Sequence, residues 1–183
     1  MSYGLSKLFV ESLNNIYMKG RYEMETAIIT GGTKGIGKAI VNKYLQEGCY
    51  TIIIYSSDDE SAKSFRQELD IKYKDKYETI KADLSKIEEI EKMCDFVKNN
   101  YPKINYLILN AGATNRNSFN DLTIDEWNQV MNVNLTMPFF IVRNLTDCIV
   151  RGGQSDFYRF GNGHLSPCDQ YTLCCVESRG SYA

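Results

Sequence analysis

Residues 30–39 read TGGTKGIGKA, and the spacing of their glycines could serve two kinds of phosphate binding. Residues 32–38 fit G-x-x-x-x-G-K, most of the loop with which mononucleotide-binding proteins hold phosphates. Residues 30–37 also fit T-G-x-x-x-G-x-G, the pattern of a turn that holds the pyrophosphate of a dinucleotide. Both patterns place backbone N–H groups around an anion, so either one predicts phosphate binding.

Ala39 decides between the two patterns. A mononucleotide loop needs Ser or Thr directly after its lysine, because that hydroxyl is a ligand of Mg²⁺, and Ala39 has no hydroxyl. In the dinucleotide pattern, Gly31 permits a sharp turn, Gly35 lets backbone N–H groups approach the pyrophosphate, and Gly37 lets a helix pack closely on a strand. The sequence therefore favours a dinucleotide over ATP. A glycine-rich turn without a ligand is the remaining alternative.

The chain around this turn alternates short apolar runs with amphipathic segments. We expect strands over 27–29, 51–55, 77–82 and 104–109, and helices over 36–45, 60–72, 85–97 and 124–150. Ser85 with Glu88, and Thr123 with Glu126, have the spacing of capping boxes at the starts of two of these helices. Such alternation is typical of right-handed βαβ units, so we predict a Rossmann-type α/β fold: a doubly wound parallel sheet with helices on both faces.

Four motifs in order resemble those of the short-chain dehydrogenase/reductase family, from residue 25 to about residue 153. They are the three glycines, Asp83 in KADLSK, Asn110-Ala111-Gly112 in LNAG, and Asn134 in VMNVNLTMPFF. The resemblance implies that Asn134 is catalytic and that a local distortion of its helix exposes a carbonyl that holds a proton-relay water. It implies cofactor contacts from Gly31, Thr33, Lys34, Gly35, Ile36, Gly37, Ser56, Asp83, Leu84, Asn110, Ala111 and Gly112.

The end of the second expected strand bears on which nicotinamide cofactor is used. An acidic residue there would bind the ribose hydroxyls of NAD and repel a 2′-phosphate. Tyr55, Ser56 and Ser57 stand there instead, and the first carboxylate is that of Asp58. Lys34 could pair with the phosphate. In the family this combination resembles NADP users, so we expect NADP rather than NAD.

The family's catalytic serine, tyrosine and lysine have no counterpart at the expected places. After residues 151–153 the chain reads QSDFYRFGNGHLSPCDQYTLCCVESRGSYA, which contains no apolar strand and no lysine. Shifting the codons from Gln154 by one base allows V-I-F-I-G-S and, later, Y-A-V-S-K, at the family's spacing. We therefore hypothesise that residues 154–183 are a frameshifted reading of the catalytic segment. As translated, the chain would then be inactive and poorly stable, and its fourth strand would be an exposed edge.

The two ends of the chain receive separate expectations. We expect residues 1–23 to be an extension of unknown role that contains a short amphipathic helix. We expect residues 24–153 to form the dinucleotide-binding domain and residues 154–183 to form an aberrant tail. His164, Cys168, Cys174 and Cys175 could ligate a metal, but their spacing fits no zinc pattern, so no metal is expected. Cys49 and Cys94 lie in amphipathic patterns and predict buried, reduced thiols.

Composition narrows the class of protein further. A net charge of −2 and a pI near 5.5 provide no basic surface for nucleic acid. No apolar stretch is long enough for a membrane span and no signal-peptide pattern begins the chain, so we expect a cytoplasmic protein. The resemblance implies an oxidoreductase that acts on a small carbonyl or alcohol, similar to the 3-oxoacyl-carrier-protein reductase branch. Family members form homo-oligomers, which a damaged catalytic half would put in doubt. A non-catalytic dinucleotide sensor or interaction module is the alternative.

Overall fold

A single parallel sheet organises the computed structural model, which describes residues 24–118 and 120–157. Its five strands lie in the order β3-β2-β1-β4-β5. Their bounds are Thr26–Thr30 for β1, Tyr50–Tyr55 for β2, Tyr77–Lys81 for β3, Ile104–Leu109 for β4 and Ile149–Phe157 for β5. Every neighbouring pair is parallel. The predicted Rossmann-type α/β fold is confirmed.

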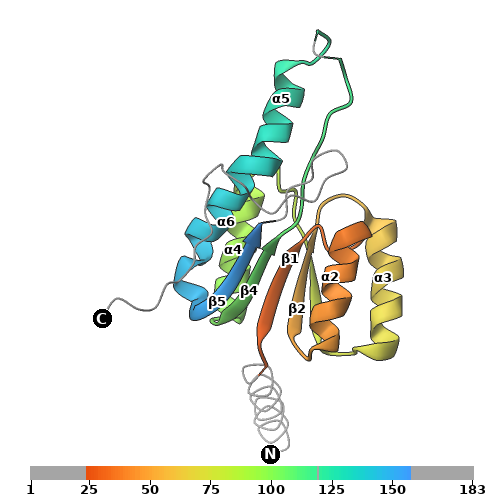
Figure 1. The fold of residues 1–183 in the computed structure, drawn as a ribbon, viewed down its shortest axis with the longest axis vertical. Coiled ribbons are helices and arrows are strands. Elements are labelled where there is room, and N and C mark those ends of the chain that lie inside the picture. The colour runs from red at the N-terminus through yellow and green to blue at the C-terminus, as the bar shows by residue number, and fades with distance from the viewer. Residues whose placement is uncertain (1–23, 119, 158–183) are drawn as a thin grey trace, which may run out of the picture.

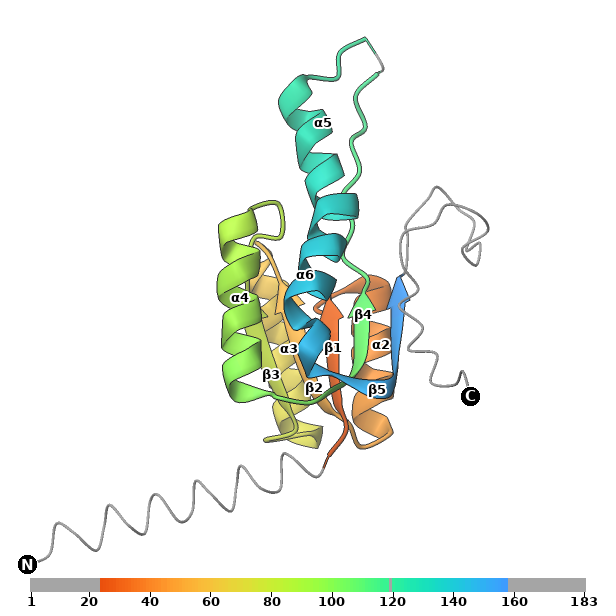
Figure 2. The same cartoon turned by 90° about the vertical axis from the view of Figure 1, so that its left-hand side faces the viewer.

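Helices connect the strands and cover both faces of the sheet (Figures 1 and 2). They are α2 (Gly35–Gln46), α3 (Asp59–Lys72), α4 (Ile87–Asn100), α5 (Ile124–Met131) and α6 (Met137–Leu145), with a π-helix over Asn132–Thr136 and a 3₁₀ turn over Thr146–Cys148. Helices α2 and α3 lie on one face, and α4 and α6 lie on the other. Figure 2 shows α5 projecting past the carboxyl ends of the strands.

The alternation of side chains along β1 divides the core into two clusters. Ala27 and Ile29 pack with residues of α2 and α3, such as Val41 and Phe65. Ile28 belongs to the other cluster, with residues of α4 and α6. Because successive side chains of a strand point to opposite faces, five buried residues in a row indicate a strand covered on both sides.

Strand β5 overturns one expectation from the sequence. We expected no strand after residues 151–153 and an exposed edge at the fourth strand. Instead, β5 runs through that boundary and pairs with β4, with Ser155 opposite Leu107 and Phe157 opposite Leu109. The register shifts between Ile104 and Tyr106. Strand pairing uses backbone N–H and C=O groups, so it forms here despite the polar side-chain types.

Two helix boundaries also differ from expectation. The Ser85 capping box is absent: Lys86 occupies the N-cap of α4 without a side-chain cap, because the hydroxyl of Ser85 donates to Asp83 instead. The helix expected over 124–150 ends at Leu145, and β5 already begins at Ile149. Thr146 donates its hydroxyl to the carbonyl of Val142, a bond that competes with helix continuation. The Thr123–Glu126 capping box is confirmed.

Cys49 and Cys94 agree with the expectation of buried thiols. Cys49 and Cys94 are free and buried, and burial raises the pKa of Cys94 to about 12, which makes its thiol unreactive. The expected helix of residues 1–23 lies outside the described residues. So do the four candidate metal ligands of the tail and the segment to which the frameshift hypothesis assigns Y-A-V-S-K.

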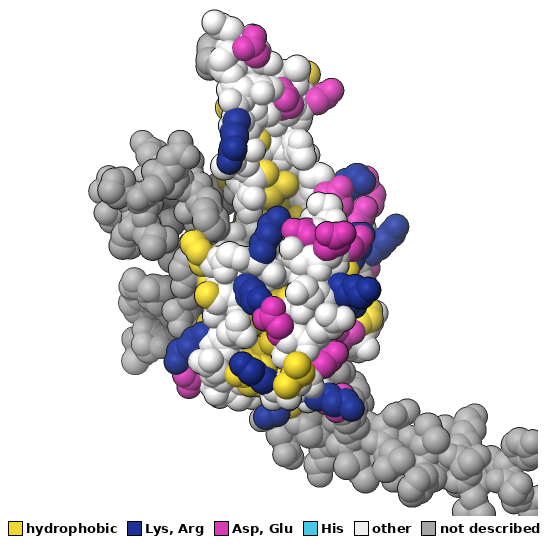
Figure 3. Space-filling model, turned by 90° about the vertical axis from the view of Figure 1, so that its right-hand side faces the viewer, with side chains coloured by type: hydrophobic (Ala, Val, Ile, Leu, Met, Phe, Trp, Pro, Cys, Tyr) yellow, Lys and Arg dark blue, Asp and Glu magenta, His cyan; other side chains and the backbone are white. Residues whose placement is uncertain are grey.

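The described surface carries charges of both signs. Figure 3 shows lysines, arginines and acidic residues interspersed over one side of the molecule. Ion pairs link α3 to its neighbours, Lys38 with Glu68 and Lys81 with Asp59. Among residues 24–118 and 120–157, every helix is too short or too polar to cross a membrane.

Candidate dinucleotide-binding site

The predicted site residues follow the carboxyl ends of the strands. The glycine turn follows β1, and Asn110 to Gly112 follow β4, the neighbour of β1 in the sheet. Strand order reverses between these two strands, because the chain leaves β1 toward β2 and returns on the other side for β4. Parallel α/β sheets bind ligands in the crevice outside such a switch point.

Gly31 and Gly37 allow the helix to close on the strand. Gly31 has a φ of +66°, which favours glycine. A Cβ on Gly37 would lie 2.1 Å from the carbonyl oxygen of Gly31 and 2.7 Å from Nδ2 of Asn110. A side chain at residue 37 would therefore push α2 away from the turn.

Gly35 has a different reason to be glycine. Its φ is +54°, yet a Cβ there would meet no atom within 4 Å. It opens α2, whose N-cap residue Lys34 makes no side-chain capping bond, and the first turn holds no acidic residue. The first N–H groups of a helix have no partner within it, so they are available to an anion. The residues present thus fit a pyrophosphate group.

Gly32 is a residue that motif reasoning missed. A Cβ at this position would lie 2.7 Å from Cγ2 of Ile53 and 3.0 Å from Cγ2 of Val41. Gly32 therefore lets the turn rest directly on the core between β2 and α2. Only its place next to Gly31 could have signalled this, and the dinucleotide pattern does not require a glycine there. Of the neighbouring residues, Thr33 is buried and Ile36 is 40% exposed.

Asn110 joins the two strand ends. It is 5% exposed, and its Nδ2 donates to the carbonyl oxygens of Thr30 (3.0 Å) and Gly31 (3.3 Å). The N–H of Ala111 donates to the hydroxyl of Thr30 at 2.9 Å. Among the described residues, Oδ1 of Asn110 is buried without a hydrogen-bond partner. These bonds fix the turn after β1 against the segment after β4.

Asn134 lies within the π-helix, so the predicted helix distortion is present. Its side chain makes two bonds to the backbone of Ala113: the N–H of Ala113 donates to Oδ1 at 2.9 Å, and Nδ2 donates to the carbonyl at 2.7 Å. The position of a Cβ on Gly112 would be 3.3 Å from Oδ1. Asn134 therefore anchors the segment that continues from Asn110 to Gly112.

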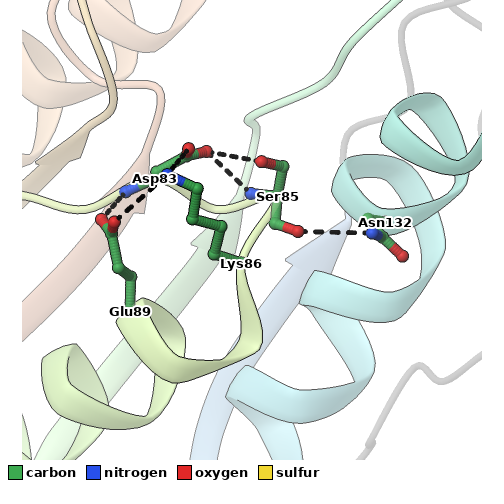
Figure 4. Close-up of polar contacts among 5 residues, drawn as sticks. All are labelled: Asp83, Ser85, Lys86, Glu89 and Asn132. Carbon is green, nitrogen blue, oxygen red and sulfur yellow. Dashed lines mark hydrogen bonds and ion pairs between the residues drawn. The ribbon is translucent and has the colours of Figure 1, made fainter. Parts of the chain in front are cut away.

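Asp83 heads a network of hydrogen bonds after β3 (Figure 4). Its Oδ1 accepts from the N–H and the hydroxyl of Ser85, at 3.1 and 2.7 Å, and its Oδ2 lies 3.1 Å from Nζ of Lys86. Hydrogen bonding from Ser85 holds the pKa of Asp83 below its ordinary value. The carboxylate is thus held ionised in a fixed orientation. The adjacent Leu84 is buried.

Lys34 and Asp58 meet beyond the end of β2. Nζ of Lys34 lies 3.2 Å from Oδ2 of Asp58. The other oxygen of Asp58 accepts from the N–H of Ser61 at 3.0 Å and caps α3. This backbone bond is the largest cause of the lowered pKa of Asp58. Ser56, two residues before Asp58, is exposed.

The structure therefore brings the predicted residues to one end of the sheet in three groups. The glycine turn, Asn110 to Gly112, and Asn134 form a bonded group at the switch point. Lys34 and Ser56 lie near the end of β2, and Asp83 lies after β3. A ligand that spans all three would have to be extended, as a dinucleotide is.

Fold and turn define a Rossmann-type protein, and comparison with known proteins gives its family. The model of the short chain dehydrogenase family matches residues 25–156. The chain belongs to the short-chain dehydrogenase family.

Two curated proteins are about 30% identical to the chain over the aligned residues. The 3-oxoacyl-[acyl-carrier-protein] reductase of Aquifex aeolicus is 32% identical, over 69% of this chain and 51% of that protein. The 3beta-hydroxysteroid dehydrogenase 2 of Eggerthella lenta is 30% identical, over 71% of this chain and 50% of that protein. The chain thus spans about half the length of these curated relatives.

A solved structure extends the comparison to three dimensions. The short chain dehydrogenase of Burkholderia cenocepacia in complex with NADP superposes with a TM-score of 0.68 at 25% identity, over 75% of this chain and 56% of that one.

Proposed function

We propose that the protein is an NADP-dependent oxidoreductase by descent, which transfers hydride between NADP(H) and a small carbonyl or alcohol. The observation that carries this proposal is the uncapped start of α2 above the glycine turn. The first N–H groups of a helix have no partner within it and suit the pyrophosphate of a dinucleotide, and the related structure from Burkholderia cenocepacia contains NADP.

Each group of residues would have its own task in holding the cofactor. The N–H groups that follow Lys34 would bind the pyrophosphate. Asp83, held ionised by its hydrogen bonds, would accept from the adenine end, and Asn134 would belong to the catalytic set. NADP(H), when bound, supplies the hydride, while the protein orients the substrate beside it.

Lys34 and Asp58 support NADP over NAD. Asp58 is committed twice, to the N–H of Ser61 and to Lys34, so it is poorly placed to rotate onto ribose hydroxyls. Lys34 is 72% exposed, and an exposed ammonium can exchange one anionic partner for another at little cost. A 2′-phosphate would thus compete with Asp58 for Lys34.

The substrate class is proposed from the relatives. One acts on a 3-oxoacyl group attached to a carrier protein and another on a 3beta-hydroxysteroid, as their names state. Both names describe an oxygen function at a secondary carbon. We propose a secondary alcohol or its ketone as the reacting group here. The catalytic serine, tyrosine and lysine are absent at their expected places, so we propose that the chain as translated binds the cofactor without turnover.

Calorimetric titration of the 183-residue chain with NADPH and NADH tests the cofactor proposal. We expect binding of both, with NADPH the tighter ligand. Lys34→Ala should weaken NADPH about tenfold and leave NADH unchanged, because a charge-assisted contact is worth about 1.4 kcal/mol. Lys43→Ala is the matched control, since Lys43 is an exposed lysine of α2, the helix that follows Lys34, and pairs with Glu47. Absence of heat with both nucleotides would refute the proposal.

A second measurement separates the enzyme from a non-catalytic sensor. If residues 154–183 are a frameshifted reading, a protein translated from the gene with its frame corrected after Gly153 would carry the serine, tyrosine and lysine. Turnover of a ketone by that protein supports an oxidoreductase. Tight NADPH binding without turnover would favour a sensor.

A further inference from the structure

Two asparagines attach the π-helix to two different loops. Asn134 holds Ala113, which follows β4. Asn132, the first residue of the π-helix, donates from Nδ2 to the carbonyl of Ser85 at 3.3 Å, and Ser85 follows β3. Residues two apart on a helix point to different sides. One turn of helix is therefore fastened to both loops at once.

The carbonyl that Asn132 binds belongs to a rigid turn. Ser85 donates both its N–H and its hydroxyl to Asp83, and the N–H of Asp83 donates to Glu89 at 2.6 Å. Lys86 pairs with the carboxylates of Asp83 and Glu89. Figure 4 shows Asn132 reaching from its helix to this network, on the side of Ser85 away from the carboxylate of Asp83. Asn132 thus contacts the same turn that presents Asp83.

A π-helix depends on such contacts. Its wide turn replaces the usual i→i+4 bonds by i→i+5 bonds and is rare, since an α-helix is ordinarily favoured. The side-chain bonds that Asn132 and Asn134 make to the two loops can stabilise this wider turn. Without Asn132, only the Asn134 side chain would link the π-helix to a loop through the side-chain hydrogen bonds of the described residues.

We propose that Asn132 is a positioning residue, which sets the place of Asn134 relative to the turn that carries Asp83. The inference rests on the proposed function, because it takes Asp83 as a contact of the bound cofactor. When NADPH engages the Asp83 turn, the hydrogen bond between Asn132 and Ser85 transmits the added rigidity to residues 132–136. The turn that carries Asp83 and the π-helix that carries Asn134 then become less mobile together.

Amide hydrogen exchange on the full 183-residue chain tests this proposal, with NADPH as the probe. In the unaltered chain, NADPH should slow exchange in three segments: residues 31–37, 83–86 and 132–136. In Asn132→Ala, protection should persist in the first two segments. In 132–136 the NADPH-dependent protection should fall about fivefold, as loss of one hydrogen bond predicts.

Two further variants make the result specific. Asn132→Asp keeps the side-chain shape but removes the donor, and it should behave like Asn132→Ala. Asn128→Ala changes an exposed asparagine of α5 and should behave like the unaltered chain. Unchanged protection of 132–136 in Asn132→Ala and Asn132→Asp would overturn the proposal. Loss of protection in all three segments of both variants would also overturn it, because Asn132 would then support the whole fold. If NADPH protects no segment of the unaltered chain, the proposed function fails first, and this inference with it.

Discussion

Strands β2 and β5 both pair in parallel with a neighbour, but their sequences differ sharply. β2 reads YTIIIY, is buried at all six positions, and stays in continuous register with β1 and β3. β5 reads IVRGGQSDF, and its pairing with β4 contains a register shift. The register sets Asp156 opposite Ile108, which is 1% exposed. Parallel strands covered by helices are usually apolar on both faces, and β5 is not.

This difference separates two contributions to the sheet. The crossover topology and the backbone hydrogen bonds can assign a strand to its place, as they do for β5. The apolar side chains contribute most of the stabilisation, at about 25 cal/mol for each Å² of apolar surface removed from water. β2 has both contributions. The residue types of β5 supply mainly the first, which is what a strand encoded in a shifted frame would show.

The largest expected effect comes from shifting the reading frame after Gly153. Under the frameshift hypothesis, the corrected tail would place an apolar strand in the position of β5 and include the tyrosine that acts as general acid in the family. General acid–base catalysis contributes about 10²- to 10⁴-fold to a rate, so we expect NADPH-dependent ketone reduction to rise by at least that factor. Oxidation of NADPH, followed by absorbance with a panel of ketones, measures it. Equal rates in the 183-residue chain would contradict the frameshift hypothesis, because the shifted segment would then add nothing to catalysis.

Single substitutions in the two strands should have opposite signs. Ile53 in β2 is fully buried, so Ile53→Ala should lower the free energy of unfolding by about 2–5 kcal/mol through lost burial and a cavity. Asp156→Val in β5 should raise it by about 1 kcal/mol, because a β-branched apolar residue suits a parallel strand. Denaturant unfolding of both variants measures these changes. A lower free energy of unfolding in the Asp156→Val variant would mean that aspartate stabilises β5 better than an apolar residue does.

Gly35 and Gly37, two glycines of the same turn, can be compared because only Gly37 has close neighbours. Gly37→Ala places a Cβ 2.1 Å from a backbone oxygen, so it should cost about 3 kcal/mol of stability and abolish NADPH binding. Gly35→Ala meets no neighbour but keeps a positive φ, which costs about 1 kcal/mol. Thermal unfolding with and without NADPH distinguishes the two. Equal losses would indicate that close packing at residue 37 is unimportant.

The smallest expected effect concerns acid sensitivity. The folded protein lowers the pKa of Asp83 below its ordinary value of 3.8, chiefly through the hydroxyl of Ser85. A lowered pKa contributes stability that is complete above the unfolded-state pKa and is lost as pH falls through the folded-state pKa. Ser85→Ala should therefore destabilise the protein at neutral pH, and this difference should shrink below about pH 4. Unfolding curves of both proteins from pH 3 to 7 test this prediction. A difference in stability that does not change with pH would mean that Ser85 stabilises the fold by a route other than the Asp83 carboxylate.

Much of the fold and part of the site could be predicted from the sequence. Apolar runs such as 51–55 gave the strands, because a strand buried on both faces needs apolar residues throughout. Thr123 with Glu126 gave a helix start, since both side chains act within one turn. The glycine spacing located the turn at β1. These signals are local, and each depends on residues close together in the chain.

The features that were not predicted depend on which of several groups a side chain or a strand pairs with in the folded protein. Ser85 had the spacing of a helix cap, but its hydroxyl bonds to Asp83 two residues earlier. The Lys34–Asp58 pair joins residues 24 apart, and only the folded sheet brings them together. Asn132 lies in the motif that contains Asn134 but was not expected to have a role, because its contact is with a loop 47 residues away. β5 was missed because its pairing depends on backbone groups that every residue has.

The π-helix also sets the rotation of α6 relative to α5 about their common axis. Each residue of a helix advances the side-chain direction by about 100°, so deleting one residue from 132–136 would rotate α6 against α5 by that angle. Met137, Ile141 and Leu145 are fully buried and would leave the sheet unless α5 swung round instead. The length of this short segment therefore fixes which way Trp127, half exposed on the projecting α5, faces its surroundings.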